Sequence, residues 1–167
     1  MTRAVLSLGA NLGDARGALA AAVRALHDHP DMTVEAVSGL WRTAPVGGPQ
    51  QPDYLNAVVL VATELSPEEL LIEAHELEAA AGRVRDERWG PRTLDVDLVE
   101  VAGVRRADPG LTLPHPRAHE RAFVLAPWAQ VAPTATLGGP DGPAVGELLA
   151  SVADQAAELV AEGDWWR

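Results

Sequence analysis

The 167-residue chain contains no cysteine and no lysine. Without cysteine, neither disulfides nor thiolate metal sites can form. Without lysine, all 13 basic residues are arginines, and a Walker-type phosphate loop, which needs a lysine on the nucleotide phosphates, is excluded. The net charge of −11 also disfavours a nucleic-acid or anionic-membrane surface, because such surfaces present broad positive fields.

Long apolar segments are missing as well. No run of 18 apolar residues occurs, and the first residues, MTRAVLSLGANLGD, lack the pattern of a signal peptide. A cytoplasmic protein without nucleic-acid or membrane partners is therefore expected. The 47% hydrophobic content, with no internal repeat or low-complexity linker, favours a single domain over residues 1–167, and a monomer is expected.

Hydrophobic periodicity predicts an ordered series of elements over residues 3–101. The series is a strand at 3–9, a helix capped by Asp14 and ending near 28, strands at 32–41 and 54–65, a helix at 66–82, and a strand at 94–101. The second helix has the clearest boundaries, with Ser66 as N-cap, Pro67 at the first position and Glu69 completing a capping box. This order predicts an α+β fold, a ferredoxin-like α/β sandwich whose antiparallel sheet has helices packed on its faces, these two on one face.

Patterns after residue 102 are weaker. Residues 103–106 suggest a short strand that returns on 94–101, and a helix is expected over roughly 117–130. Residues 144–160 are amphipathic, and the C-terminal segment 134–167 contains no motif that indicates a function.

The segment GRVRDERWGPRTLDVDLV, residues 82–99, combines acids and arginines in an unusual way. Asp95 and Asp97 share one face of the predicted strand, about 7 Å apart, while Leu94, Val96 and Leu98 face the core. Two carboxylates on one face suit a hard divalent cation with oxygen ligands, magnesium above all. The alternative is an edge strand with a solvated acidic face.

Four arginines precede these acids within ten positions: Arg83, Arg85, Arg88 and Arg92. Guanidinium groups bind phosphate oxygens in bidentate fashion, so arginines beside metal-binding acids indicate a nucleotide-dependent transfer site without a phosphate loop. Alternatively, the arginines form surface salt bridges with Glu76, Glu78, Asp86 and Glu87. Trp89, in the same loop, either packs on a guanidinium group or covers the core.

The sequence RWGPRTLDVDLV resembles the signature of the 6-hydroxymethyl-7,8-dihydropterin pyrophosphokinases. Further blocks resemble that family in the same order: SLGANLGD, WRTAPVGGPQQPDYLNAVV (41–59), HELEAAAGRVR (75–85) and LPHPRAHERAFVLAPWAQVAP (113–133). The resemblance implies a ferredoxin-like fold. It also implies transfer of the diphosphate group of ATP to the hydroxymethyl group of 6-hydroxymethyl-7,8-dihydropterin, giving AMP and the pterin diphosphate, in tetrahydrofolate biosynthesis.

The resemblance further implies a role for individual residues. It assigns two magnesium ions to Asp95 and Asp97, and phosphate contacts in the transition state to Arg83 and Arg92. It implies that the nucleotide is contacted by His75, Glu78, Arg85, Arg88, Trp89, Leu98, Thr112, His115 and Arg121. It implies that the pterin ring is contacted by Thr43, Ala44, Val46, Tyr54, Asn56 and Phe123.

Other interpretations stay open at this stage. His115 lies between two prolines, where a rigid-turn role is common, and Asn56 could cap a strand end instead of pairing with a ring edge. A non-catalytic ferredoxin-like module that binds a small ligand would be a different function. So would a magnesium-dependent phosphotransferase acting on another hydroxymethyl heterocycle.

Overall fold

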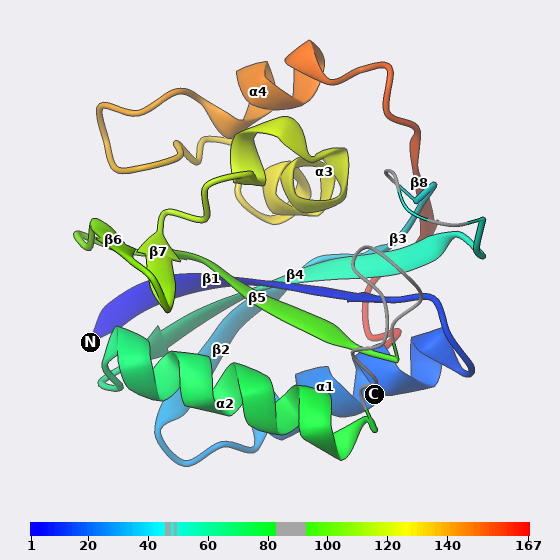
Figure 1. The fold of residues 1–167 in the computed structure, drawn as a ribbon, viewed down its shortest axis with the longest axis horizontal. Coiled ribbons are helices and arrows are strands. Elements are labelled where there is room, and N and C mark those ends of the chain that lie inside the picture. The colour runs from blue at the N-terminus through cyan, green and yellow to red at the C-terminus, as the bar shows by residue number, and fades with distance from the viewer. Residues whose placement is uncertain (46–47, 49, 83–92) are drawn as a thin grey trace.

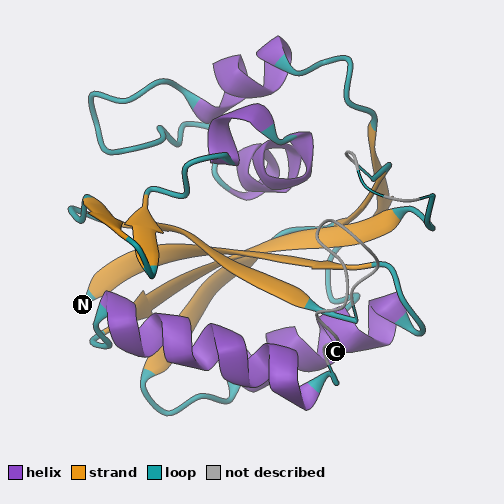
Figure 2. Ribbon diagram, in the orientation of Figure 1, coloured by secondary structure: helices purple, strands orange, loops and turns teal. Residues whose placement is uncertain are grey.

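A six-stranded antiparallel sheet separates two helical layers in the computed structural model, which describes residues 1–45, 48, 50–82 and 93–167 (Figures 1 and 2). The strand order is β5-β1-β4-β3-β8, and β2 pairs with β4 as well. The strands are β1 (Thr2–Ala10), β2 (Met32–Val37), β3 (Leu40–Thr43), β4 (Tyr54–Thr63), β5 (Asp95–Val101) and β8 (Ala157–Ala161). The predicted α+β class and antiparallel sheet are confirmed.

Helices α1 (Ala15–His27) and α2 (Pro67–Ala80) cover one face of the sheet, as predicted (Figure 1). The other face is covered by α3 (Ala122–Val131), and α4 (Val145–Ser151) packs on α3 and on the 3-10 turn η1 (Ala118–Glu120), farther from the sheet. Each face has its own apolar core, because side chains alternate along the strands. In β1, for example, Leu6 and Leu8 belong to the core under α1 and α2, whereas Val5 packs with Leu125 and Trp128 of α3.

The start of α2 follows the predicted capping box. The Ser66 hydroxyl accepts a hydrogen bond from the Glu69 backbone N–H, and the Glu69 carboxylate accepts one from the Ser66 N–H, both at 3.1 Å. Asp14 caps α1 in a similar way by accepting from the Gly17 N–H at 3.0 Å. Local sequence signals therefore fix where both helices begin.

The predicted strand 32–41 is instead two strands, β2 and β3, with a break at Ser38 and Gly39. There the Ser38 hydroxyl accepts the Val58 N–H in place of a backbone carbonyl. Strand β8 passes so close to Gly39 that an added Cβ would lie 2.6 Å from the Ala161 carbonyl oxygen. Periodicity did not reveal the break, and the close approach of β8 leaves room only for glycine at residue 39.

Two predictions after residue 102 need correction. Residues 103–106 do not return on 94–101; β6 (Arg106–Asp108) pairs with β7 (Leu111–Leu113) in a separate hairpin. The helix expected over 117–130 is divided into η1 and α3 by the extended residue Arg121.

The amphipathic segment 144–160 contains α4 and then β8, which pairs with β3 at the sheet edge. Beyond β8 the chain reaches the other helical layer, where Trp165 and Trp166 are buried beside α1 (Figure 1). The Trp165 indole N–H donates to the Ser38 carbonyl oxygen at 2.8 Å. Among the described helices, none combines the length and apolar character needed to cross a bilayer.

Candidate active site

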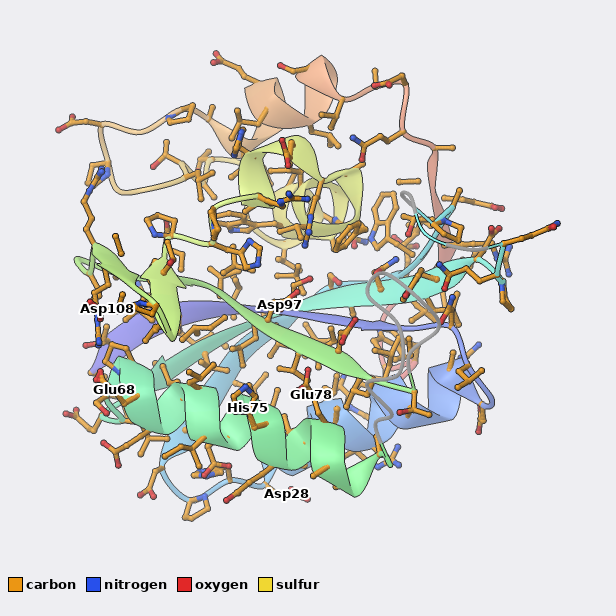
Figure 3. The ribbon with its side chains drawn as sticks, viewed as in Figure 1. Asp28, Glu68, His75, Glu78, Asp97 and Asp108 are labelled. Atoms are coloured by element: carbon orange, nitrogen blue, oxygen red, sulfur yellow. The ribbon has the colours of Figure 1, made fainter. Side chains whose placement is uncertain are left out.

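Asp95 and Asp97 lie on β5, at the edge of the sheet, and alternate with residues buried on the α2 side, so they face the α3 layer. Asp97 is labelled in Figure 3. Leu94, Val96 and Leu98 are buried in the core on the α2 side, which confirms the predicted alternation. Asp95 and Asp97 are half-buried, and as residues i and i+2 of one strand they lie about 7 Å apart. The strand is an edge strand, but its acidic face is only partly solvated.

Glu78 of α2 supports β5 from the α2 side of the sheet. Its side chain rises from α2, is 5% exposed, and accepts a hydrogen bond from the Val96 backbone N–H at 3.0 Å (Figure 3). Val96 lies between the two acids, so Glu78 fixes the backbone that carries both. His75, one turn earlier on α2, is exposed. Both residues belong to the layer opposite α3, and their predicted nucleotide contacts stay predictions.

A row of register partners connects the acid pair with Asn56. Asp95 lies opposite Gly9 of β1, and Gly9 lies opposite Asn56 of β4, so all three project toward the same face. Two inter-strand spacings place Asn56 about 10 Å from Asp95. Gly9 has no side chain to fill this interval, and a Cβ added there would lie 3.0 Å from Asn56 Oδ1. Gly9 therefore forms the floor between the acid pair and the amide, and a larger residue there would crowd Asn56 Oδ1.

Asn56 is the third residue of β4, within the strand and not at its end. It is 2% exposed, and its Nδ2 donates to the Thr43 hydroxyl oxygen at 2.7 Å. That bond turns Oδ1 toward Gly9, on the side of the acids. Tyr54 lies two residues earlier on the same face, opposite Thr43 of β3, and is half-buried.

Arg121 and His115 provide positive charge and a hydrogen-bond donor on the α3 side. Burial lowers the pKa of Arg121, while the nearby carboxylates of Asp97 and Asp95 act in the opposite direction. A guanidinium group stays protonated even so. Its Cζ lies 5.3 Å from the centroid of the Phe123 ring, within range of a cation–π interaction. Arg121 therefore packs on the aromatic ring and is close enough to the acid pair to interact with it electrostatically.

His115 is neutral in the free protein. Burial first, and then the charges of Arg121 and Arg117, lower its pKa to about 4. Its Nδ1 accepts the Arg117 backbone N–H at 3.2 Å, so in the neutral ring the proton is on Nε2. This tautomer can donate to an anionic oxygen.

A pocket of about 330 Å³ opens beside Phe123. Its lining comes from the end of β3, the start of α3 and the segment before β8: Thr43, Ala44, Pro45, Ala122, Phe123, Asp154, Gln155 and Ala156. The volume is in the range of small-molecule sites. Three residues expected to contact the pterin, Thr43, Ala44 and Phe123, thus line one pocket. Residues 154–156 of the C-terminal segment form another side of this pocket, which the sequence did not indicate.

The remaining expected site residues are not all gathered there. Leu98 directs its side chain into the core, and Thr112 is exposed on β7. Val46, Arg83, Arg85, Arg88, Trp89 and Arg92 lie outside the described residues. The predictions for those six, including salt bridges from the arginines, are therefore neither supported nor contradicted by the structure.

Thr93 was not expected at the site. Its hydroxyl is buried and, within the part of the chain that the structure describes, makes no hydrogen bond. An unpaired buried hydroxyl costs about 1–3 kcal/mol, and such groups are often reserved for a ligand. Thr93 immediately follows the arginine segment and lies two residues before Asp95, which is the only sequence signal that could have identified it.

The donor set fits a hard divalent cation in part. Among the described residues, no three histidine, cysteine, aspartate or glutamate side chains gather to form a complete metal site. Asp95 and Asp97 offer carboxylate oxygens without nitrogen or sulfur ligands, which suits magnesium, an ion that keeps waters and takes substrate phosphates as further ligands. The residues present therefore fit magnesium held jointly by the protein and a nucleotide.

Comparison with known proteins identifies a family. The sequence model described as 7,8-dihydro-6-hydroxymethylpterin-pyrophosphokinase (HPPK) matches residues 5–133. The 2-amino-4-hydroxy-6-hydroxymethyldihydropteridine pyrophosphokinase of Methylorubrum extorquens is 45% identical over 160 residues, covering 96% of this chain and 99% of the relative. The enzyme of the same name from Bacillus subtilis is 43% identical over 128 residues, covering 77% of each chain.

The fold is also similar to solved structures. In the crystal structure of Plasmodium falciparum HPPK-DHPS S436F/A437G/A613S with pterin and p-hydrobenzoate, the matching part gives a TM-score of 0.67 at 13% identity. The match covers 92% of this chain and 44% of that longer chain. At this identity the likeness concerns the fold alone.

Proposed function

Because this chain belongs to the 7,8-dihydro-6-hydroxymethylpterin-pyrophosphokinase family, we propose that it uses ATP and magnesium to transfer a diphosphate group to 6-hydroxymethyl-7,8-dihydropterin. The products are AMP and the pterin diphosphate, an intermediate of folate biosynthesis. The observation that carries the proposal is the row Asp95, Gly9, Asn56 on one face of the sheet. It supports a phosphate end and a ring end about 10 Å apart.

At the phosphate end, Asp95 and Asp97 would hold the two magnesium ions. Bound magnesium would neutralise phosphate charge and polarise the phosphorus under attack. Arg121 and the Nε2–H of His115 would bind phosphate oxygens from the α3 side. Arg83 and Arg92, supported by Arg85 and Arg88, belong to the same proposal because their segment leads directly into β5.

At the ring end, Asn56 would pair with the amide-like edge of the pterin. The bond from Nδ2 to Thr43 holds the amide in one orientation, which reduces the entropy lost on binding. Tyr54 and Phe123 would stack on the ring, and the pocket beside Phe123 would accommodate it. Arg121, packed over Phe123, would link the two ends.

In the reaction, the pterin hydroxymethyl oxygen attacks the β-phosphorus of ATP. The bond from that phosphorus to the oxygen bridging it to the α-phosphate breaks, AMP leaves, and the hydroxyl proton is released. The chain's contribution is to hold both substrates in line and to bind the charge that develops on the phosphates.

The test is to incubate the protein with ATP, magnesium and 6-hydroxymethyl-7,8-dihydropterin, and to measure AMP and the pterin diphosphate. We expect both products in equal amounts, and none after EDTA treatment until magnesium is restored. Pterin binding without AMP formation would indicate a non-catalytic module, an alternative that the family match does not support. If AMP formed with another hydroxymethyl heterocycle but not with the pterin, the proposal that the pterin is the substrate would be wrong. A monomeric, cytoplasmic enzyme stays a prediction from the sequence.

A further inference from the structure

Gln155 uses both ends of its side-chain amide on the backbone around Arg121. Its Nε2 donates to the Glu120 carbonyl oxygen at 2.8 Å, and its Oε1 accepts the Ala122 N–H at 3.0 Å. These partners are the residues immediately before and after Arg121. A distant side chain, 33 residues from Ala122 along the chain, thus binds the backbone as a neighbouring strand would.

Gln155 adds to the local turn and helix bonds of this segment: the Arg121 N–H donates to the Ala118 carbonyl oxygen at 3.3 Å, and the Arg121 carbonyl oxygen accepts the Leu125 N–H at 3.0 Å. Arg121 has extended dihedral angles (φ −120°, ψ 108°) between the turn η1 and helix α3, and its side chain does not cap the helix. Ala122 is the first residue of α3, so its N–H belongs to the group that the helix itself leaves unpaired. Gln155 satisfies that N–H, and it is the side chain that joins the residues on both sides of Arg121.

Gln155 is itself held firmly. Its backbone N–H donates to the Val152 carbonyl oxygen at 2.9 Å, which joins it to the end of α4. Two residues later, β8 begins with Ala157, which lies opposite Thr43 in the sheet. The side chain also lines the pocket together with Phe123 and Thr43. It therefore connects the strand that carries Thr43 with the segment that carries Arg121 and Phe123.

We infer that Gln155 is a positioning residue that sets Arg121 against the Asp95–Asp97 pair and Phe123 against the pocket. The inference rests on the proposed function and assigns it a residue from the C-terminal segment, which carries no recognisable motif. Arg121 reaches toward the phosphate end and Phe123 toward the ring end, so this one amide organises both halves of the site.

The experiment compares Gln155→Ala with Gln130→Ala, a matched control at the other end of α3. Gln130 likewise makes two hydrogen bonds with its side chain, both accepted by Oε1: from the Gly39 N–H at 2.8 Å and from the Trp41 indole N–H at 2.9 Å. Neither partner belongs to the Arg121 segment. We expect Gln155→Ala to lower kcat about 10-fold and to raise the KM for the pterin, while Gln130→Ala changes thermal stability with little effect on either constant.

A double-mutant cycle separates positioning from a general structural role. In the Arg121→Ala background, Gln155→Ala should lower kcat less than about 2-fold, because Arg121, through which it affects kcat, is gone; the rise in the KM for the pterin, which depends on Phe123, should remain. If the full 10-fold loss persisted there, or if Gln130→Ala produced the same loss, the inference would be wrong. Gln155→Glu keeps the acceptor for Ala122 but cannot donate to Glu120, so an intermediate kcat is expected; this variant replaces the alanine variant if the latter does not fold.

A readout without substrates distinguishes this inference from the proposed function. The Ala122 amide should exchange its hydrogen faster in Gln155→Ala than in the unmodified protein, even if no AMP is ever formed. Unchanged exchange would overturn the positioning role alone. Absence of AMP from the unmodified protein would overturn the proposed function alone.

Discussion

Replacing Asn56 by alanine tests whether the ring end of the site is correctly assigned. The side chain is 2% exposed and bonded to the Thr43 hydroxyl, so its amide is both desolvated and fixed before any ligand arrives. Losing a buried amide pair with the pterin should cost about 1–3 kcal/mol of binding free energy. At about 1.4 kcal/mol per tenfold change, the Kd for the pterin should rise about 5-fold to 150-fold.

Calorimetry with the pterin in the presence of a non-hydrolysable ATP analogue measures this loss, and the analogue titrated alone gives the nucleotide affinity. We expect the nucleotide affinity to stay nearly unchanged, because Asn56 lies two strands from the acid pair. Thr43→Val is the control: it removes the partner of Asn56 but keeps the amide, so it should weaken pterin binding less than Asn56→Ala does. Equal losses for pterin and nucleotide in Asn56→Ala would mean that Asn56 belongs to the scaffold, and the reasoning would be refuted.

Three further predictions concern the neighbouring residues. Asp97→Asn keeps the shape of the side chain but removes its charge. The rate of AMP formation at saturating magnesium should therefore fall about 10³-fold or more, while the circular dichroism spectrum stays unchanged. Near-normal turnover would contradict the assignment of magnesium to Asp97. Gly9→Ala places a Cβ 3.0 Å from Asn56 Oδ1, so calorimetry should show pterin binding weakened about 10-fold. An unchanged affinity for the pterin would mean that Gly9 does not border the ring site. His115 has a folded-state pKa of about 4, below its ordinary 6.5, so the stability it contributes is complete above pH 6.5 and is lost as the pH falls toward 4. Partial exposure of His115 reduces this loss to about 1–2 kcal/mol of unfolding free energy. In urea unfolding, the free energy of unfolding of His115→Asn should therefore fall less between pH 7 and pH 4.5 than that of the unmodified protein. An equal fall in both proteins would contradict the lowered pKa of His115.

Much of the fold could be predicted because its signals are local. The capping box at Ser66 and Glu69, the alternation along 94–101 and the order of the first six elements depend on residues close together in the sequence. The break at Ser38 and Gly39 was missed because the alternation continues across it, and the close approach of β8 to Gly39 comes from the far end of the chain. The separate β6–β7 hairpin was not predicted for another reason: each of its strands has three residues, too few to show a hydrophobic period.

The site shows the same division. The sequence pointed to Asp95, Asp97 and Asn56, whose chemistry is unusual for their places in apolar strands. It gave no sign of Gln155, because a glutamine in an amphipathic segment looks like any solvated residue until its two backbone partners are known. The Glu78 carboxylate was expected to face the nucleotide, and only the structure revealed its bond to Val96.

That bond has a consequence for how the protein behaves among other chains. An edge strand presents unpaired N–H and C=O groups to which a strand of another molecule can add, and β5 is such an edge. A strand of another molecule would need the Val96 N–H as a hydrogen-bond donor. That N–H already donates to the buried side chain of Glu78, which occupies the position of the added strand. An approaching strand would have to displace a buried hydrogen bond at the middle of the edge. The acid-bearing strand is thereby protected from intermolecular sheet formation while its other face stays open to substrate.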